Sequence, residues 1–273
     1  MKNYIGVTGI ANISDNVTTV KSFVNHGIDM ESNHTPMIGF LVNKKTLYKI
    51  PAKAGKIPHQ RYPPVSSLRR MMEYSKGYAV NAIHFSARDD DNLDEEVKQL
   101  FHLDNIYRDN FCNTLQLNVL YPEKNKLEKI LGEFSKMSII LQLPKRILED
   151  KKNIAKKIKD YSGLIRGVLI DPSGGKGKEF DIELSAEIYK RIKEKFPELI
   201  VGIAGGLNGK NVYEKIILFK EKIKSYDFSI DAEGGLRIYE EDENKNVITD
   251  MLSSDLVAEY IFNANRYFGW NIS

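Results

Sequence analysis

The sequence predicts an α/β fold, a single (β/α)8 barrel of the TIM-barrel type that spans residues 1–273. Eight short apolar runs rich in β-branched residues recur along the chain, and segments with helical periodicity lie between them. The length of 273 residues is close to the roughly 250 residues typical of one such barrel. Eight strand-helix repeats favour a closed barrel over an open, doubly wound sheet. No linker or low-complexity tract divides the chain, so we expect one domain.

The eight apolar runs are the expected strands. They are Tyr4–Val7, Pro36–Val42, Tyr78–Phe85, Asn113–Leu120, Ser138–Leu143, Gly167–Ile170, Leu199–Ala204 and Asp227–Ile230. Runs such as IRGVLID and LIVGIAGG are apolar almost throughout, which suits strands buried on both faces of a parallel sheet. The clearest helices are expected where apolar residues return every three or four positions, at Ile182–Phe196, Asn211–Lys224 and Ser253–Phe268.

The least regular stretch is Asn43–Ser67, which holds four prolines and several lysines and has no clear period. We expect an enlarged loop after the second strand. Loops longer than about 12 to 15 residues are usually lids, binding loops or disordered segments. Such a loop would leave the rim of the barrel where active sites lie, and it is either a lid or a plain insertion.

Composition and charge point to a small-molecule partner. The 40 Lys and Arg residues against 37 Asp and Glu leave a net charge of +3, too small and too dispersed for a nucleic-acid binder. No apolar run approaches the roughly 18 residues needed to cross a bilayer. Cys112 is the only cysteine, and the N-terminus lacks the pattern of a secretory leader, so we expect a cytoplasmic protein, either monomer or homodimer.

We expect neither a metal nor an organic cofactor. The two charge-rich stretches, Arg88–Asp91 and Tyr239–Asn246, are interpreted as solvated loops. Neither has the ordered ligand spacing around a glycine turn that characterises calcium-binding loops.

Asp171 is the first candidate catalytic residue. It ends an apolar strand and is followed by the glycine-rich segment that contains Gly174, Gly175 and Lys176. A carboxylate on the last residue of a barrel strand points at the active site, whereas the same residue within the strand would be a costly buried charge. The glycines let the backbone approach a ligand, and the lysine can reach anionic oxygens. The alternative is that Asp171 only caps the following turn.

Two glycine pairs predict a phosphate site. Gly205–Gly206 follows the seventh expected strand, and Asp231 with Gly234–Gly235 follows the eighth. Phosphate sites in these barrels frequently form between the loops after strands seven and eight, where backbone N–H groups hold the anion. Either pair alone could mark only a turn, and the two positions support each other.

Other strand ends offer polar side chains. Asn118 and Gln142 are candidates to line the site, and His84 has a pKa suited to acid–base work. A single histidine in such a run is more often a packed, hydrogen-bonded residue, so both interpretations of His84 stand.

The last third of the chain resembles phosphoribosylanthranilate isomerase, a ribulose-phosphate-binding barrel. The matching segments are Ile170–Asp171 with the loop Gly175–Asp181, then Ala204–Asn208, then the strand end at Asp231. The resemblance is specific over roughly the last 110 residues and rests on short matches before them. It implies an enzyme that acts on a phosphorylated sugar or phosphoribosyl compound by acid–base, isomerase-type chemistry.

The resemblance fails at one catalytic position. The family's general base is a cysteine at the end of the first strand, where this sequence has Thr8. The family reaction needs an acid that opens the ribose ring and a base that removes a proton from the adjacent carbon. Asp171 can supply one of the two, but a threonine hydroxyl is not ionised near neutral pH. The alternatives are a non-catalytic phosphate-binding or scaffolding barrel, and a lyase or other enzyme of the superfamily with a different substrate.

Two further departures concern arginine. The family's arginine after strand two, which contacts the substrate carboxylate, has no clean counterpart, because Lys44, Lys45 and Arg61 all fall in the enlarged loop. Arg237 stands where the family has glutamate. It either adds a positive charge near the phosphate or pairs with Glu240 on the surface.

Overall fold

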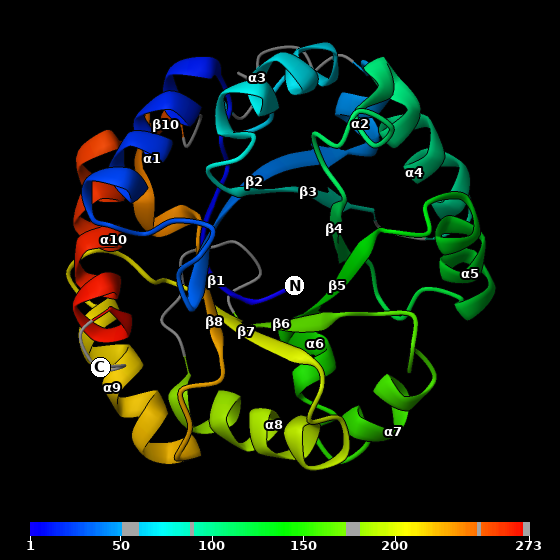
Figure 1. The fold of residues 1–273 in the computed structure, drawn as a ribbon, viewed down its shortest axis with the longest axis vertical. Coiled ribbons are helices and arrows are strands. Elements are labelled where there is room, and N and C mark those ends of the chain that lie inside the picture. Colours follow the sequence, from blue (N-terminus) through cyan, green and yellow to red (C-terminus); the bar gives the residue numbers. More distant parts are fainter. Residues whose placement is uncertain (51–59, 88–89, 173–180, 245–246, 270–273) are drawn as a thin grey trace.

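Eight parallel strands form a closed barrel with helices around it, which confirms the predicted fold class (Figure 1). The computed structural model describes residues 1–50, 60–87, 90–172, 181–244 and 247–269. The barrel strands are β1 (Asn3–Thr8), β2 (His34–Asn43), β3 (Val80–Ser86), β4 (Thr114–Asn118), β5 (Ser138–Pro144), β6 (Gly167–Asp171), β7 (Ile200–Ala204) and β8 (Ser229–Ala232). Each expected strand overlaps one of these, with ends that differ by at most two residues.

The helices follow the strands in turn. They are α1 (Ile13–Asn25), α2 (Lys44–Leu47), α3 (Leu68–Ser75), α4 (Leu93–His102), α5 (Lys124–Glu133), α6 (Lys145–Leu148), α7 (Ile154–Lys159), α8 (Ile182–Lys195), α9 (Val212–Ile223) and α10 (Ser254–Phe268). The three expected helices correspond to α8, α9 and α10. None of the helices in the described parts of the chain is both long and apolar enough to cross a membrane.

The inside of the barrel is apolar at one level and polar above it. Six buried side chains form a separate inner cluster: Tyr4, Met37, Ala82, Ile140, Leu169 and Ala204. Toward the C-terminal ends of the strands, glycines make room for polar groups. A Cβ on Gly6 would lie 2.4 Å from the Asp231 carboxylate oxygen, and a Cβ on Gly39 would lie 2.4 Å from the Thr8 hydroxyl oxygen. Small residues in β1 and β2 therefore give the site its interior space.

The segment Asn43–Ser67 is more structured at its ends than the sequence predicts. The side chain of Asn43 accepts a hydrogen bond from the backbone N–H of Thr46 at 3.0 Å and starts the short helix α2. The far end forms the 3-10 turn η1 (Val65–Ser67). Local capping and turn hydrogen bonds override the lack of period. Residues 51–59 of this segment lie outside the described residues.

A hairpin follows β8. Part of this hairpin, Tyr239–Asn246, was interpreted from the sequence as a solvated loop. Strand β9 (Arg237–Glu241) pairs antiparallel with β10 (Val247–Leu252), and the 3-10 turn η3 (Gly234–Leu236) precedes it. Although much of the hairpin is exposed, Arg237 and Asp250 are buried. Side chains alternate between the two faces of a strand, so Arg237 and Asp250 lie on the face of the hairpin that packs against the protein. The charge-rich composition of the segment did not indicate that two of its charges are buried.

Gly39→Ala should destabilise the fold, because its Cβ would lie 2.4 Å from Thr8 Oγ1 and 3.0 Å from His84 Nε2. Overpacking of this kind costs about 1 to 3 kcal/mol. The matched control is Gly132→Ala in helix α5, where a Cβ would meet no other atom within 4 Å. Denaturant unfolding should show a loss for the first variant and no loss for the second. Equal stability of both variants would contradict the described packing around Gly39.

Candidate active site

A cavity of about 240 Å³ opens at the C-terminal ends of the barrel strands. Asp171, His84, Asn118 and Gln142, all candidates from the sequence, line it. Gly205, Gly206, Asp231 and Gly234 line it as well. The strand register therefore brings most of the described candidates to one place, at the end of the barrel where such folds carry their active sites.

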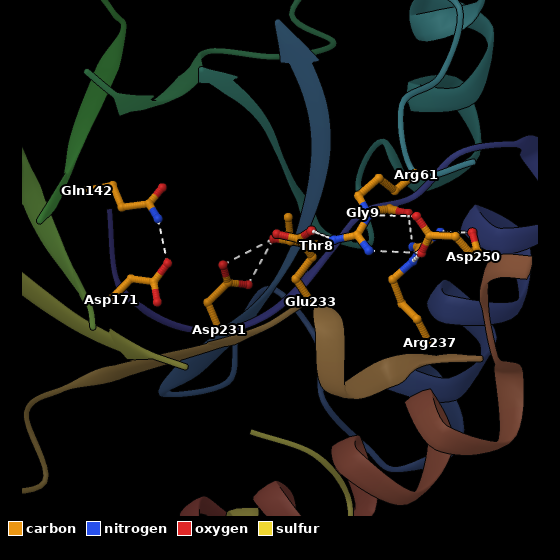
Figure 2. Close-up of polar contacts among 9 residues, drawn as sticks. All are labelled: Thr8, Gly9, Arg61, Gln142, Asp171, Asp231, Glu233, Arg237 and Asp250. Atoms are coloured by element: carbon orange, nitrogen blue, oxygen red, sulfur yellow. Dashed lines mark hydrogen bonds and ion pairs between the residues drawn. The ribbon is translucent and has the colours of Figure 1, made fainter. Parts of the chain in front are cut away.

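Asp231 is the central ionisable group of the cavity. It lies on β8 opposite Gly6 of β1, and its two carboxylate oxygens lie 2.9 and 3.1 Å from the Thr8 hydroxyl oxygen (Figure 2). Burial, together with the nearby charges of Glu233 and Asp171, raises the pKa of Asp231 to about 8. The Thr8 hydrogen bond acts in the opposite direction. Asp231 is therefore mostly protonated at neutral pH and can release a proton.

Thr8 lies beside Asp231 rather than at the cavity surface. Its side chain is buried, and it is not among the described residues that line the cavity. Its hydroxyl points at the Asp231 carboxyl group. Thr8 is thus a hydrogen-bond donor to a neighbouring acid.

Asp171 ends β6, and Gln142 supports it from β5. The Gln142 Nε2 group donates a hydrogen bond of 2.6 Å to Asp171 Oδ2, a contact visible in Figure 2. The loop after Asp171 was expected to contribute Gly174, Gly175 and Lys176, and these three lie outside the described residues.

His84 is hydrogen-bonded to Gln116, a residue that was not among the candidates from the sequence. Gln116 Nε2 and His84 Nδ1 are 3.0 Å apart, and donation by the amide places the imidazole proton on Nε2. Burial lowers the pKa of His84 to about 3. The sequence left open whether His84 titrates near neutral pH or is a packed, hydrogen-bonded residue. Desolvation keeps the ring neutral in that pH range, where the side chain can serve only as a hydrogen-bonding group.

The two glycine pairs have different surroundings. Gly205 and Gly206 adopt φ values of 116° and 63°, which L side chains rarely adopt, and both face the cavity. Gly234 lines the cavity too, but Gly235 packs against the preceding loop, since a Cβ there would lie 2.2 Å from the Leu207 carbonyl oxygen. Close packing thus accounts for glycine at position 235.

A buried network of charges that sequence reasoning did not find closes one side of the cavity. Arg61 Nη1 lies 2.7 Å from Glu233 Oε1, while Arg61 Nε and Nη2 contact the two carboxylate oxygens of Asp250 at 2.9 and 3.0 Å (Figure 2). Asp250 also accepts a hydrogen bond of 2.6 Å from Arg237 Nε. Arg237 therefore pairs with Asp250, and the surface pairing with Glu240 is wrong.

The network joins three loops. Arg237 Nη1 donates to the Gly9 carbonyl oxygen at 2.9 Å, so the end of β1, the β9–β10 hairpin and the segment that carries Arg61 are tied together. Arg61, Tyr62 and Glu233 line the cavity. Arginine, aspartate and glutamate are common on protein surfaces, so these residue types did not indicate a buried network. The one signal in the sequence is the high density of charged residues after strand eight.

Within the described residues, no group of three or more His, Cys, Asp or Glu side chains is arranged to hold a metal ion. Residues 88–89 of the charge-rich stretch Arg88–Asp91 lie outside those residues. Cys112 is buried, and burial raises the pKa of its thiol to about 12, so it does not act as a nucleophile near neutral pH.

Comparison with known proteins supports the barrel fold but assigns the chain to no family. A scan of protein-family models finds no match, and a search of curated proteins finds no significant match. Solved structures do match. Phosphoribosyl anthranilate isomerase from Thermus thermophilus is 15% identical, with a TM-score of 0.59 over 96% of this chain and 98% of that chain. The enzyme of that name from Thermotoga maritima is 18% identical, with a TM-score of 0.58 over 97% and 100%.

A chitinase domain from Pyrococcus furiosus has a comparable TM-score of 0.55 at 12% identity, covering all of this chain and 97% of that one. Barrels with different chemistries are thus similar to this chain to about the same degree. At these identities, the comparison supports the barrel architecture, and the chemistry must be argued from the site.

The buried Asp231 carboxyl group should make stability fall as pH rises. Its pKa in the folded state is about 8, above the roughly 3.9 of an unfolded aspartate. The folded state therefore binds more protons between about pH 4 and pH 8, and the stabilisation is lost across that window. Asp231→Asn removes this dependence and should gain stability relative to wild type as pH approaches 9.

Denaturant unfolding from pH 5 to pH 9 measures the effect, with exposed Asp160→Asn as the control, which should follow the wild-type profile. A profile for Asp231→Asn parallel to wild type would show that Asp231 is ionised in the fold.

Proposed function

We propose that this protein is an enzyme that binds a phosphorylated sugar or phosphoribosyl compound and isomerises it by acid–base chemistry. The observation that carries the proposal is the pair of carboxyl groups in one cavity, Asp231 with a pKa raised to about 8 and Asp171 hydrogen-bonded by Gln142. A buried carboxyl group with a strongly raised pKa, in the same cavity as a second carboxyl group, is typical of acid–base sites.

The two groups take complementary roles. Asp231 gives its proton to the ring oxygen as the bond between that oxygen and the anomeric carbon breaks. The anomeric hydroxyl or amine group donates a lone pair to the carbon as that bond breaks. Asp171 then removes a proton from the adjacent carbon and delivers it to the former anomeric carbon, while the hydroxyl proton of the enol passes back to Asp231. The ketose forms, and both carboxyl groups regain their starting protonation states. Thr8 orients the Asp231 carboxyl group through its hydrogen bond and is not itself the base. This assignment provides an acid and a base in the absence of the family's cysteine.

The phosphate group is assigned to the loops after β7 and β8. Gly205, Gly206 and Gly234 line the cavity there, where backbone N–H groups can approach an anion closely. The structurally similar phosphoribosyl anthranilate isomerase has been crystallised with a reduced carboxyphenylamino deoxyribulose 5-phosphate, a phosphorylated sugar derivative. That ligand class fits a site with one polar, acid-lined region and one glycine-rich loop.

The raised pKa of Asp231 weighs against a purely scaffolding role. A carboxyl group buried against Gly6 lowers the stability of the fold at neutral pH and above, since ionisation there is opposed. A barrel without a reaction to perform gains nothing from keeping such a group inside.

Proton exchange tests the proposed reaction. The purified protein is incubated in deuterated water with a panel of aldose phosphates and phosphoribosyl amines, including phosphoribosylanthranilate. Proton NMR then follows loss of the proton next to the anomeric carbon and formation of the ketose. Asp171→Asn and Asp231→Asn should each reduce the rate by about 10² to 10⁴, the usual contribution of a positioned acid or base.

Asp160→Asn, an exposed aspartate outside the cavity, is the matched control and should keep the wild-type rate. Rates that survive both cavity substitutions would remove the assigned roles. Absence of exchange with every compound in the panel would overturn the isomerase proposal.

A further inference from the structure

The charged groups around Arg61 bear on which substrates the cavity accepts. Arg61 is the one Lys or Arg side chain among the described residues that line the cavity, whereas three acidic residues line it: Asp171, Asp231 and Glu233. Among the described residues, Arg61 is therefore the side chain on which a subsite for a second anionic group, in addition to the phosphate, would be built.

All three nitrogens of the Arg61 guanidinium already contact carboxylates of the protein. Nε and Nη2 bind Asp250 at 2.9 and 3.0 Å, in the two-point geometry that makes arginine–carboxylate pairs strong. Nη1 binds Glu233 at 2.7 Å. These contacts use three of the five N–H donors of the guanidinium, and two carboxylates, one of them Glu233 at the cavity, offset its positive charge.

The pairing of Arg61 with Asp250 is held in place by further contacts. Asp250 is fully buried and is held by Arg237, which in turn donates to the Gly9 carbonyl oxygen. If Arg61 turned toward a ligand, the buried Asp250 would lose one of its two arginine partners. Loss of a partner from a buried ion pair is costly.

We propose that Glu233 is a specificity-determining residue that offsets the positive charge of Arg61 at the cavity, so that the non-phosphate part of the substrate is an uncharged group and not a carboxylate. The inference rests on the proposed function only for the phosphate end of the substrate. It separates this site from that of the resembling family, in which an arginine meets a substrate carboxylate. An amide, a hydroxyl group or an unsubstituted aromatic amine fits the neutralised Arg61 side of the cavity.

Two small probes of equal shape and different charge test the proposal: benzamide and benzoate. Protein-observed NMR titrations measure the dissociation constant of each probe for the wild-type protein. Wild type should bind benzamide more tightly than benzoate. Glu233→Gln preserves the shape of the side chain and removes its charge, so benzoate should then bind about tenfold more tightly, with benzamide changed by less than about twofold.

Two controls separate the role of Arg61 from a general change in charge. Glu240→Gln removes an exposed carboxylate from β9 and should leave both dissociation constants unchanged. Adding Arg61→Met to Glu233→Gln should abolish the gain for benzoate. A wild-type preference for benzoate, an unchanged benzoate-to-benzamide ratio in Glu233→Gln, or no binding of either probe to either protein would overturn the proposal.

Ribose 5-phosphate forms a separate arm of the titration. If it fails to bind while the probe pair behaves as expected, the proposed phosphate-sugar function fails and the role of Glu233 stands. If it binds while Glu233→Gln leaves the probe ratio unchanged, the role of Glu233 fails and the proposed function stands.

Discussion

Asp231 sits inside the barrel with its carboxyl group over Gly6 and both oxygens within 3.1 Å of the Thr8 hydroxyl. Much of the site follows from accommodating this one group. The strand beside it must carry a glycine, because any Cβ at position 6 would overlap the carboxylate. The residue two positions further along β1 must offer a hydrogen bond, because a buried acid without a partner is costly. Thr8 supplies that hydrogen bond.

The second organising interaction is the chain of charges from Glu233 through Arg61 and Asp250 to Arg237. Each member is partly or fully buried, so each needs the others for its charge to be tolerated. The chain ties the β9–β10 hairpin to Arg61 and Glu233, which line the cavity. It also determines the electrostatic character of this side of the cavity, because carboxylates of the protein offset the positive charge of Arg61.

Several features of the fold could be predicted because they depend on neighbouring residues. The positions of the eight strands and of α8, α9 and α10 follow from apolar runs and helical periods, which are local patterns. The short elements at the ends of Asn43–Ser67 and the β9–β10 hairpin were not predicted, because neither segment has a clear apolar period. Capping hydrogen bonds and cross-strand pairing stabilise these elements, and the composition of a charged stretch does not reveal such contacts.

By itself, the sequence determined the barrel, the strand ends that carry Asp171 and Asp231, and the glycines that follow strands seven and eight. Only the tertiary structure decided what these groups contact. Arg61 meets Glu233 and Asp250 across 172 and 189 residues of chain, and Thr8 meets Asp231 across 223. Closure of the barrel sets these pairings, since β1 and β8 become neighbours only when the sheet returns on itself. The same closure removes His84 from water and shifts its pKa away from the range that its residue type suggests.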